Sequence, residues 1–224
     1  MKRYVFVQGL CQDMRVLDVA CGTGYGVHYL AGFAEQIIGI DQSWEAVSYA
    51  YEHYRRENTA FYVMNAGTLG FRDKSFDVVC SFETIEHLRN VEFYLGEVVR
   101  ILKSNGVYLV SSPCVKETTL TPENPFHCQE WSVLDFETLL KRYFGSVRLF
   151  GQRRRQTTLH RLLQKADIFN LRKRIRLPQL TKSLSFAVGT PPFCEMGLND
   201  LEIVENDFNR ALWTIGICSA PKKN

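Results

Sequence analysis

A glycine-rich turn and one carboxylate are the first residues whose spacing indicates chemistry. Three glycines alternate with other residues over 22–26, directly after the apolar run 15–20. Glycine lets the backbone adopt positive φ and approach a ligand closely. Asp41 stands 19 residues after Gly22, at the end of a second apolar run. A carboxylate there can accept hydrogen bonds from both hydroxyls of a ribose, although Asp41 or Ser43 could instead only cap the next helix.

The spacing of the glycines argues against two common phosphate-binding loops. Residues 21–26 read Cys-Gly-Thr-Gly-Tyr-Gly. A dinucleotide-binding turn has the spacing G-x-G-x-x-G, and a P-loop carries a lysine after its last glycine. A glycine turn alone is a weak indication, because many strand-to-helix turns use glycine for geometry. The interpretation therefore depends on the elements around the turn.

Short apolar runs alternate along the chain with segments of helical periodicity. This alternation predicts parallel strands with helical crossovers, and hence an α/β fold with helices on both faces of one seven-stranded sheet. Ligands of such sheets bind outside the carboxyl ends of the strands, where the unusual residues of this chain fall. The expected strands are residues 15–20, 36–41, 60–65, 76–82, 106–112, 146–151 and 211–219, and the expected helices lie near 27–34, 43–54, 91–102 and 132–142.

Five motifs follow one another along the chain: VLDVACGTGYG at 16–26, IIGID at 37–41, FDVVCSFETIEHL at 76–88, EVVRILKSNG at 97–106 and YLVSSP at 108–113. Their order and spacing resemble the class I S-adenosylmethionine-dependent methyltransferase family. The resemblance implies a three-layer, doubly wound, mostly parallel sheet with an antiparallel last strand. It implies one methyltransferase domain over residues 1–224, with a helical and loop insertion at 152–209, and S-adenosylmethionine as the cofactor.

The resemblance also implies which residues bind the cofactor. They are Asp18 with the backbone of Ala20 and Gly22 for the methionine amine and carboxylate, Gly24 in the same turn, Asp41 for the ribose, Gln42, Asn65 and Ala66 for the adenine, and Phe82 for the methionyl chain. The family usually has an acid where this chain has Asn65. An amide oxygen can still accept from the adenine amino group, but the bond loses charge assistance, so a somewhat lower affinity is expected.

Two histidines follow predicted strands on the side expected to receive the methyl acceptor. His87 comes after 76–82 and His127 after 106–112, so both should border one pocket. Methylation of a hydroxyl or ammonium needs a base, and histidine suits near-neutral pH. In sugar-methylating relatives a histidine at the His87 position can serve as that base. The alternatives are that His87 caps its turn or packs on the cofactor, and that His127 only orders its loop.

Residues 123–151 resemble a subgroup of ubiquinone and sugar methyltransferases of the methyltransferase-11 type, which is often found with glycan assembly enzymes. This favours a small-molecule, sugar or glycan acceptor methylated at oxygen or nitrogen. One alternative is a nucleic-acid methyltransferase, but no Asn/Asp-Pro-Pro-Tyr-type tetrapeptide follows 76–82, where the chain continues Glu-Thr-Ile. The other alternative is a module that binds the cofactor without turnover.

The positive charge of the chain is concentrated in one segment. The whole chain has a net charge of +3, yet residues 148–182 contain eleven Lys or Arg and a single acid. Basic and apolar residues interleave over 153–176, a pattern that could contact an anionic membrane surface or nucleic-acid phosphates. We favour the alternative, a helical cap over the acceptor pocket that keeps its charges in water.

Composition predicts a cytoplasmic protein. No apolar run approaches the roughly 20 residues that cross a bilayer, and the first residues do not read as a signal peptide. Seven scattered cysteines without a C-x-x-C pair indicate a reducing compartment, and no ligand spacing predicts a metal site. Only 14 residues precede the first expected strand. We therefore expect a truncated chain or a partly open cofactor site, with Arg3 and Tyr4 as the remnant of a lid.

Overall fold

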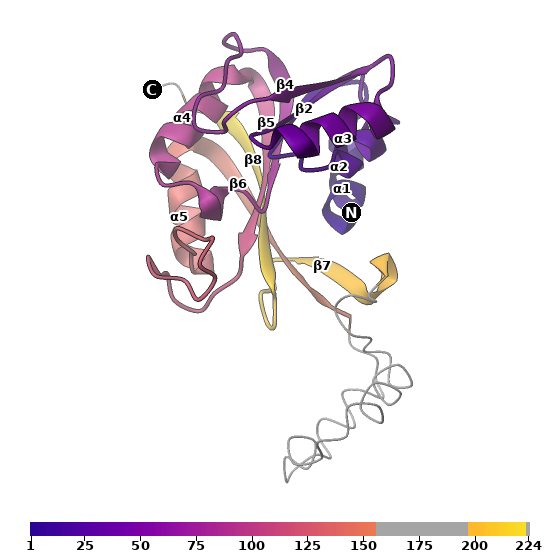
Figure 1. The fold of residues 1–224 in the computed structure, drawn as a ribbon. Helices are drawn as coiled ribbons and strands as arrows, with labels where there is room; N and C mark the ends of the chain where they lie inside the picture. Colours follow the sequence, from indigo (N-terminus) through magenta and orange to yellow (C-terminus); the bar gives the residue numbers. More distant parts are fainter. Residues whose placement is uncertain (156–196, 223–224) are drawn as a thin grey trace, which may run out of the picture.

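The computed structural model describes residues 1–155 and 197–222, which form an eight-stranded sheet with helices on both faces (Figure 1). The strands are β1 (Arg15–Val19), β2 (Gln36–Asp41), β3 (Thr59–Val63), β4 (Phe76–Phe82), β5 (Leu102–Pro113), β6 (Phe144–Arg154), β7 (Leu201–Glu205) and β8 (Trp213–Pro221). Their order in the sheet is β3-β2-β1-β4-β5-β8-β6-β7.

The sheet is parallel from β3 to β5, and β8 runs antiparallel to both of its neighbours, β5 and β6. The predicted parallel sheet with an antiparallel last strand is therefore confirmed. The chain moves outward from β1 to β3 and then returns to place β4 on the other side of β1. Strand order reverses at that point, which is where doubly wound sheets hold ligands.

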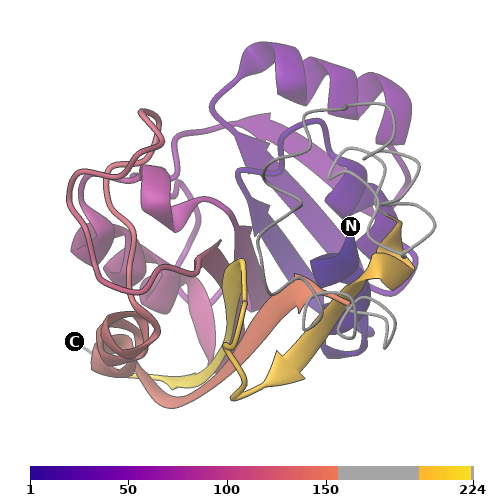
Figure 2. The ribbon, with the colours of Figure 1, turned by 90° about the horizontal axis from the view of Figure 1, so that it is seen from below.

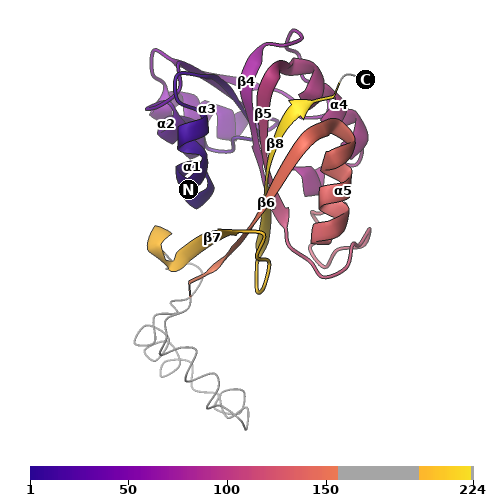
Figure 3. The same ribbon diagram turned by 180° about the vertical axis from the view of Figure 1, so that it is seen from behind.

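Two helical layers enclose the sheet (Figure 3). Helices α1 (Lys2–Val7), α2 (Tyr25–Leu30) and α3 (Trp44–Tyr54) cover one face, and α4 (Val91–Ile101) and α5 (Val133–Tyr143) cover the other. Each face has its own apolar core, so the central strands are buried on both sides, as expected for parallel strands. No helix of the described residues is long and apolar enough to cross a bilayer.

The strand β7 was not predicted. It lies within 152–209, which the sequence analysis interpreted as a helical and loop insertion without a strand pattern. Its residues are only partly buried, and ion pairs help to attach it to β6: Arg148 with Glu205 at 2.8 Å and Arg153 with Glu202 at 2.7 Å. An edge strand held in this way lacks the apolar alternation that identifies a strand. Figure 2 shows β6 and β7 together at the edge of the sheet.

Of the basic segment 148–182, the structure describes only residues 148–155. Arg153 also pairs with Asp207 at 2.7 Å, so part of the positive charge is neutralised within the sheet. The predicted membrane contact or helical cap at 153–176 falls mostly on residues 156–196, which lie outside the described residues.

The turn expected at 104–106 is part of β5. Phe76 stands opposite Leu102 while Val78 stands opposite Val107, so β5 advances five residues where β4 advances two. The additional residues form a bulge, which accommodates Asn and Gly without ending the strand. Helix α1 (Lys2–Val7) was not among the expected helices, and the other expected strands and helices differ from the structure by a few residues at their ends.

Ser43 caps α3, as the sequence predicted, and its hydroxyl accepts a hydrogen bond from the Ala46 N–H at 3.1 Å. We predict that Ser43→Ala lowers the free energy of unfolding by about 1 kcal/mol, because one helix N–H loses its acceptor. Urea denaturation followed by circular dichroism measures the change. Ser43→Asp retains a capping oxygen and should unfold like the wild type; equal stability of Ser43→Ala would contradict the capping role.

Candidate active site

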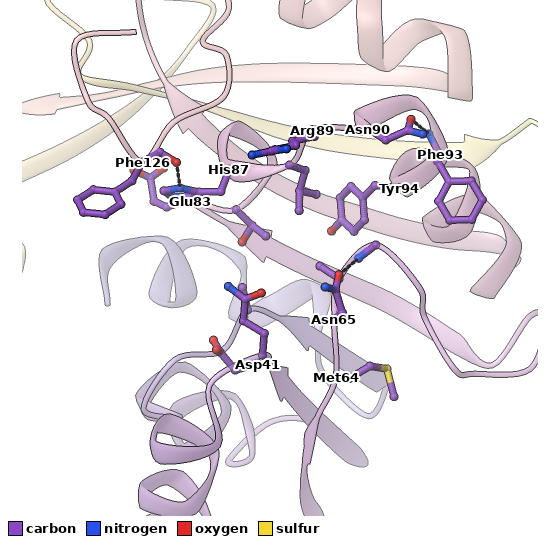
Figure 4. A pocket seen from close by; sticks show the side chains of 16 residues that line it. Asp41, Met64, Asn65, Glu83, His87, Arg89, Asn90, Phe93, Tyr94 and Phe126 are labelled. Carbon is purple, nitrogen blue, oxygen red and sulfur yellow. Dashed lines mark hydrogen bonds between the residues drawn. The ribbon is translucent and has the colours of Figure 1, made fainter. Parts of the chain in front are cut away.

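A cavity of about 640 Å³ opens at the carboxyl ends of the central strands. In Figure 4, Asp41 and Asn65 lie on one side of it, and His87, Arg89 and Phe126 on the other. Its lining is Ala20 after β1, Asp41 and Gln42 at β2, Met64, Asn65, Ala66 and Gly67 after β3, Glu83, Thr84, His87, Leu88, Arg89 and Asn90 after β4, Phe93 and Tyr94 on α4, and Phe126 after β5.

Asp41 links the end of β2 to the turn after β1. Its Oδ2 accepts the N–H of Gly22 at 2.9 Å and its Oδ1 accepts the N–H of Ser43 at 2.9 Å. A carboxylate has about four lone-pair positions, so two remain for hydroxyl donors from a ligand. Asp41 therefore accepts a hydrogen bond at the start of α3 and also lines the cavity. A helix-start role and a ribose-binding role are compatible.

The backbone at this edge adopts conformations that are uncommon for side-chain-bearing residues. Ala20 and Glu83, which follow β1 and β4, both have φ of 56°. Left-handed geometry costs a non-glycine residue roughly 1–2 kcal/mol, and such strain clusters at functional sites. The chain therefore turns sharply away from the sheet after both strands, and this edge of the sheet stays open.

The glycines of the turn have two different uses. A Cβ on Gly24 (φ of 82°) would lie 2.6 Å from the Cβ of Ala50, so this glycine allows α2 to pack on α3. A Cβ on Gly22 (φ of 53°) would meet nothing within 4 Å. The space beside Gly22 is open, which fits a ligand that approaches the backbone. Neither glycine lines the cavity itself.

Asp18 is fully buried beneath α1. The hydroxyl of Tyr4 donates to its Oδ2 at 3.0 Å, while its Oδ1 has no hydrogen-bond partner. Burial raises the pKa of Asp18 to about 7, although the Tyr4 hydrogen bond opposes the shift. A buried acceptor without a partner is costly. It suits a ligand ammonium group, which is the role that the resemblance implies.

Helix α1 covers this part of the site. Tyr4 packs edge-on against Phe82 at 5.1 Å between ring centroids, and Arg3 pairs with Glu83 at 3.3 Å. Phe82 is buried and contacts Tyr4 rather than lining the cavity. The expected lid remnant at Arg3 and Tyr4 thus forms the cover over Asp18.

Asn65 lies just beyond β3, not within it. Its Oδ1 accepts the N–H of Gly67 at 2.7 Å, which folds the loop into the cavity wall beside Ala66. One lone pair of that oxygen and the amide N–H groups remain for a ligand. The geometry is compatible with the adenine contact expected of Asn65.

His87 presents one ring nitrogen to the cavity. Its Nδ1 lies 2.8 Å from the carbonyl oxygen of Phe126, which can only accept, so Nδ1 carries the proton. In the neutral ring, Nε2 then has a free lone pair. The side chain is exposed at the cavity rim, so this lone pair is available to an acceptor molecule.

His127 lies beside His87 but does not line the cavity. The ring centroids are 4.8 Å apart. Nδ1 of His127 contacts Glu130 at 2.5 Å, and Nε2 contacts the Nδ2 of Asn124 at 2.9 Å. Both ring nitrogens are engaged, which matches the loop-ordering alternative. A direct catalytic role for His127 needs one of these contacts to break.

No spacing in the sequence predicts a metal site, but three potential ligand residues come together in the structure. Glu86, His87 and His127 each offer a ligand atom, and these atoms all lie within 4.8 Å of one another. Burial raises the pKa of Glu86 to about 8, with a smaller contribution from the nearby Glu83. The spacing in the sequence did not reveal this cluster because its members come from two separate loops.

Several lining residues were missed by the sequence analysis. The segment 83–90 and the start of α4 contribute Glu83, Thr84, Arg89, Asn90, Phe93 and Tyr94. Their signal was position alone: they follow β4 at the carboxyl edge. Met64 and Gly67, next to Asn65, were also missed.

Residues 10–167 match the family model of the methyltransferase domain, which is more than half of the chain. The chain belongs to the class I S-adenosylmethionine-dependent methyltransferase family. A relative from Mycolicibacterium smegmatis, named a probable S-adenosylmethionine-dependent methyltransferase, is 34% identical over 134 residues, covering 58% of this chain and 51% of the relative. The chain spans about half the length of this relative and of two similarly named relatives from Mycobacterium tuberculosis.

Two further relatives have named substrates. The phosphoethanolamine N-methyltransferase of Triticum aestivum is 34% identical over 50% of this chain and 23% of its own length. The ubiquinone biosynthesis O-methyltransferase of Pelagibacter ubique is 26% identical over 45% of this chain and 42% of its own.

Several solved structures share the fold. The YcgJ protein of Bacillus subtilis has a TM-score of 0.63 at 18% identity, with 100% of this chain and 99% of that one covered. An N1-methyltransferase of Burkholderia thailandensis with bound S-adenosylhomocysteine has a TM-score of 0.56 at 16% identity, with 64% and 65% covered. At these identities the comparison concerns the fold alone.

Replacement of Asp41 tests the cofactor position of this methyltransferase-family chain. We predict that Asp41→Ala weakens binding of S-adenosylmethionine by at least about tenfold, because hydrogen bonds to a charged group are worth about 1.5–3 kcal/mol each. Isothermal titration calorimetry measures the affinity. Glu52→Ala, on the exposed face of α3, removes a comparable charge and should bind like the wild type. Unchanged affinity of Asp41→Ala would place the ribose elsewhere.

The raised pKa of Asp18 predicts a pH dependence of cofactor binding. Below pH 7 the carboxyl group is protonated, and an ammonium ligand must displace that proton. The association constant should therefore fall by about tenfold per pH unit between about pH 7 and pH 5. Asp18→Asn should bind weakly with a flat profile over the same range, as measured by calorimetry. A wild-type profile as flat as that of the variant would exclude Asp18 from the amine contact.

Proposed function

We propose that this chain transfers a methyl group from S-adenosylmethionine to an oxygen or nitrogen of a small-molecule, sugar or glycan acceptor. The observation that carries the proposal is the arrangement of Asp41 and His87 on facing sides of one cavity (Figure 4). Asp41 supplies carboxylate oxygens that can accept hydrogen bonds from the hydroxyls of a nucleoside. His87 supplies a free lone pair where the methyl acceptor would enter. The two groups divide the cavity into a donor side at Asp41, for the methyl donor, and an acceptor side at His87, for the methyl acceptor.

The residues at the donor side fit the sulfonium cofactor. S-adenosylmethionine supplies an electrophilic methyl group, already activated by its bond to a positively charged sulfur. Asp18 would hold the ammonium through its unpartnered Oδ1, and Asp41 would hold the ribose hydroxyls. The open space at Gly22 would admit the methionyl backbone, while Gln42, Asn65 and Ala66 would border the adenine.

The acceptor side must align a nucleophile with the methyl group and remove its proton. Alignment supplies much of the rate enhancement when the reacting atoms are held in line. His87 is fixed by its Phe126 hydrogen bond, so its Nε2 keeps a constant direction. Arg89 lines the same cavity and would favour an acceptor that carries an anionic group.

The size of the cavity supports a small acceptor or the end of a glycan. A volume of about 640 Å³ lies in the usual range of small-molecule sites. The names of the plant and bacterial relatives, for phosphoethanolamine and ubiquinone biosynthesis, support small acceptors as well. Incubation with methyl-labelled S-adenosylmethionine and a panel of phenols, amines, sugars, glycans and nucleic acids tests the proposal. Label in nucleic acid alone, or cofactor binding without any labelled product, would replace it with one of the two alternatives.

We predict that His87→Gln lowers kcat by about 10²-fold or more, since the lone pair on Nε2 is lost while a side chain of similar length remains. The affinity for S-adenosylmethionine should change little, because the ring lies on the acceptor side. Steady-state kinetics with the best acceptor of the panel measures both constants. The control is His53→Gln on α3, an exposed histidine distant from the cavity lining. Wild-type turnover by His87→Gln would remove His87 from the reaction.

A further inference from the structure

The cluster of Glu86, His87 and His127 lies where the loops after β4 and β5 meet. Its potential ligand atoms are all within 4.8 Å of one another, and His87 also lines the cavity. Two imidazoles and one carboxylate are a donor set that binds divalent transition metals. The role of this cluster is not explained by cofactor binding.

Both imidazoles are oriented as in metal sites. Histidine ligands usually donate their other ring N–H to a carbonyl or carboxylate, which fixes the tautomer and the direction of the ring. Nδ1 of His87 donates to the carbonyl oxygen of Phe126 at 2.8 Å. Nδ1 of His127 lies 2.5 Å from a carboxylate oxygen of Glu130. Each ring therefore directs its Nε2 as the ligand atom.

Glu86 is a buried carboxylate whose side chain has no hydrogen-bond partner. Glu86 is 1% exposed, and neither of its side-chain oxygens accepts a hydrogen bond. Its backbone oxygen accepts the N–H of Cys128 at 2.7 Å, which fixes the β5 loop against this segment. A buried polar side chain is normally hydrogen-bonded or coordinates a metal. Glu86 thus has the position and the free lone pairs of a third ligand.

We propose that Glu86, His87 and His127 bind a divalent transition-metal cation at the acceptor end of the cavity. In the structure, Asn124 donates its Nδ2 hydrogen to His127, so the cation would displace this amide. Oxygen-preferring Mg²⁺ fits two imidazoles less well than Mn²⁺, Co²⁺ or Zn²⁺. Three protein ligands leave coordination positions open to an acceptor molecule.

The inference rests on the proposed function and changes the role of His87 from base to ligand. A bound cation lowers the pKa of a hydroxyl that it coordinates. The O–H bond of the acceptor then breaks, with the proton released to water. The oxygen forms a bond to the methyl carbon as the carbon–sulfur bond breaks, and the electron pair of that bond stays on sulfur as the neutral thioether. The acceptor class is accordingly one with a hydroxyl oxygen that a cation can coordinate.

Titration of the chelator-treated, dialysed protein with Co²⁺ tests the site, because the visible absorption of Co²⁺ reports nitrogen and oxygen ligands directly. We expect one equivalent to bind with new visible bands. His87→Gln, His127→Gln and Glu86→Gln should each weaken binding at least tenfold, whereas His53→Gln on α3 should bind like the wild type. Asn124→Ala should bind at least as tightly as the wild type, since it removes the competing N–H. Calorimetry with S-adenosylmethionine confirms that each variant is folded.

Three results would overturn the metal proposal: no saturable Co²⁺ signal, a signal that survives loss of both histidines, or stronger binding of Mg²⁺ than of Co²⁺ and Mn²⁺. Should Glu86→Gln fail to fold, the two histidine variants and the wild-type spectrum still decide. Methyl transfer separates this proposal from the proposed function. If methyl transfer persists after chelation and no Co²⁺ binds, the metal proposal is wrong and the proposed function stands. If Co²⁺ binds tightly but no acceptor is methylated, the metal site stands and the proposed function is wrong.

Discussion

The site depends on the bond between the Asp41 carboxylate and the Gly22 N–H, which joins the end of β2 to the turn after β1. Parallel pairing aligns the two strands, and this contact, together with the hydrogen bond from the Cys21 N–H to the Ile40 carbonyl oxygen at 2.9 Å, sets the position of the turn. The same carboxylate holds the Ser43 N–H and so directs the start of α3. One side chain thereby coordinates a strand end, a glycine turn and a helix start, and the cavity forms around them.

Much of the fold could be predicted because its determinants are local. Continuous apolar runs identify buried parallel strands, and Ser43 marks a helix start whatever the tertiary context. The donor side of the cavity was predictable for the same reason, since Asp41 and Asn65 each follow a strand whose carboxyl end lies at a known edge. The predictions were less accurate where pairing is decided by long-range contacts. Strand β7 depends on the arginines of β6, and residues 104–106 bulge because β4 continues beside them.

The acceptor side was harder to predict because its residues meet across two loops. His87 and His127 were identified individually, but nothing in their spacing showed that Glu86 lies beside both of them. The sequence also did not reveal that Phe126 selects the tautomer of His87, since a backbone carbonyl has no residue-type signal. Such features follow from loop geometry.

The pairing of β6 with β7 has a consequence for how this protein could diversify. Arg154 stands opposite Leu201, so β6 and β7 pair as the two arms of one hairpin. Because β6 runs parallel to β5, that hairpin opens at the edge where the cavity lies. Insertions or deletions between Arg154 and Leu201 would leave the hydrogen-bonded ladder of the two arms intact. The architecture therefore provides an evolutionary graft point, separate from the residues that line the cavity.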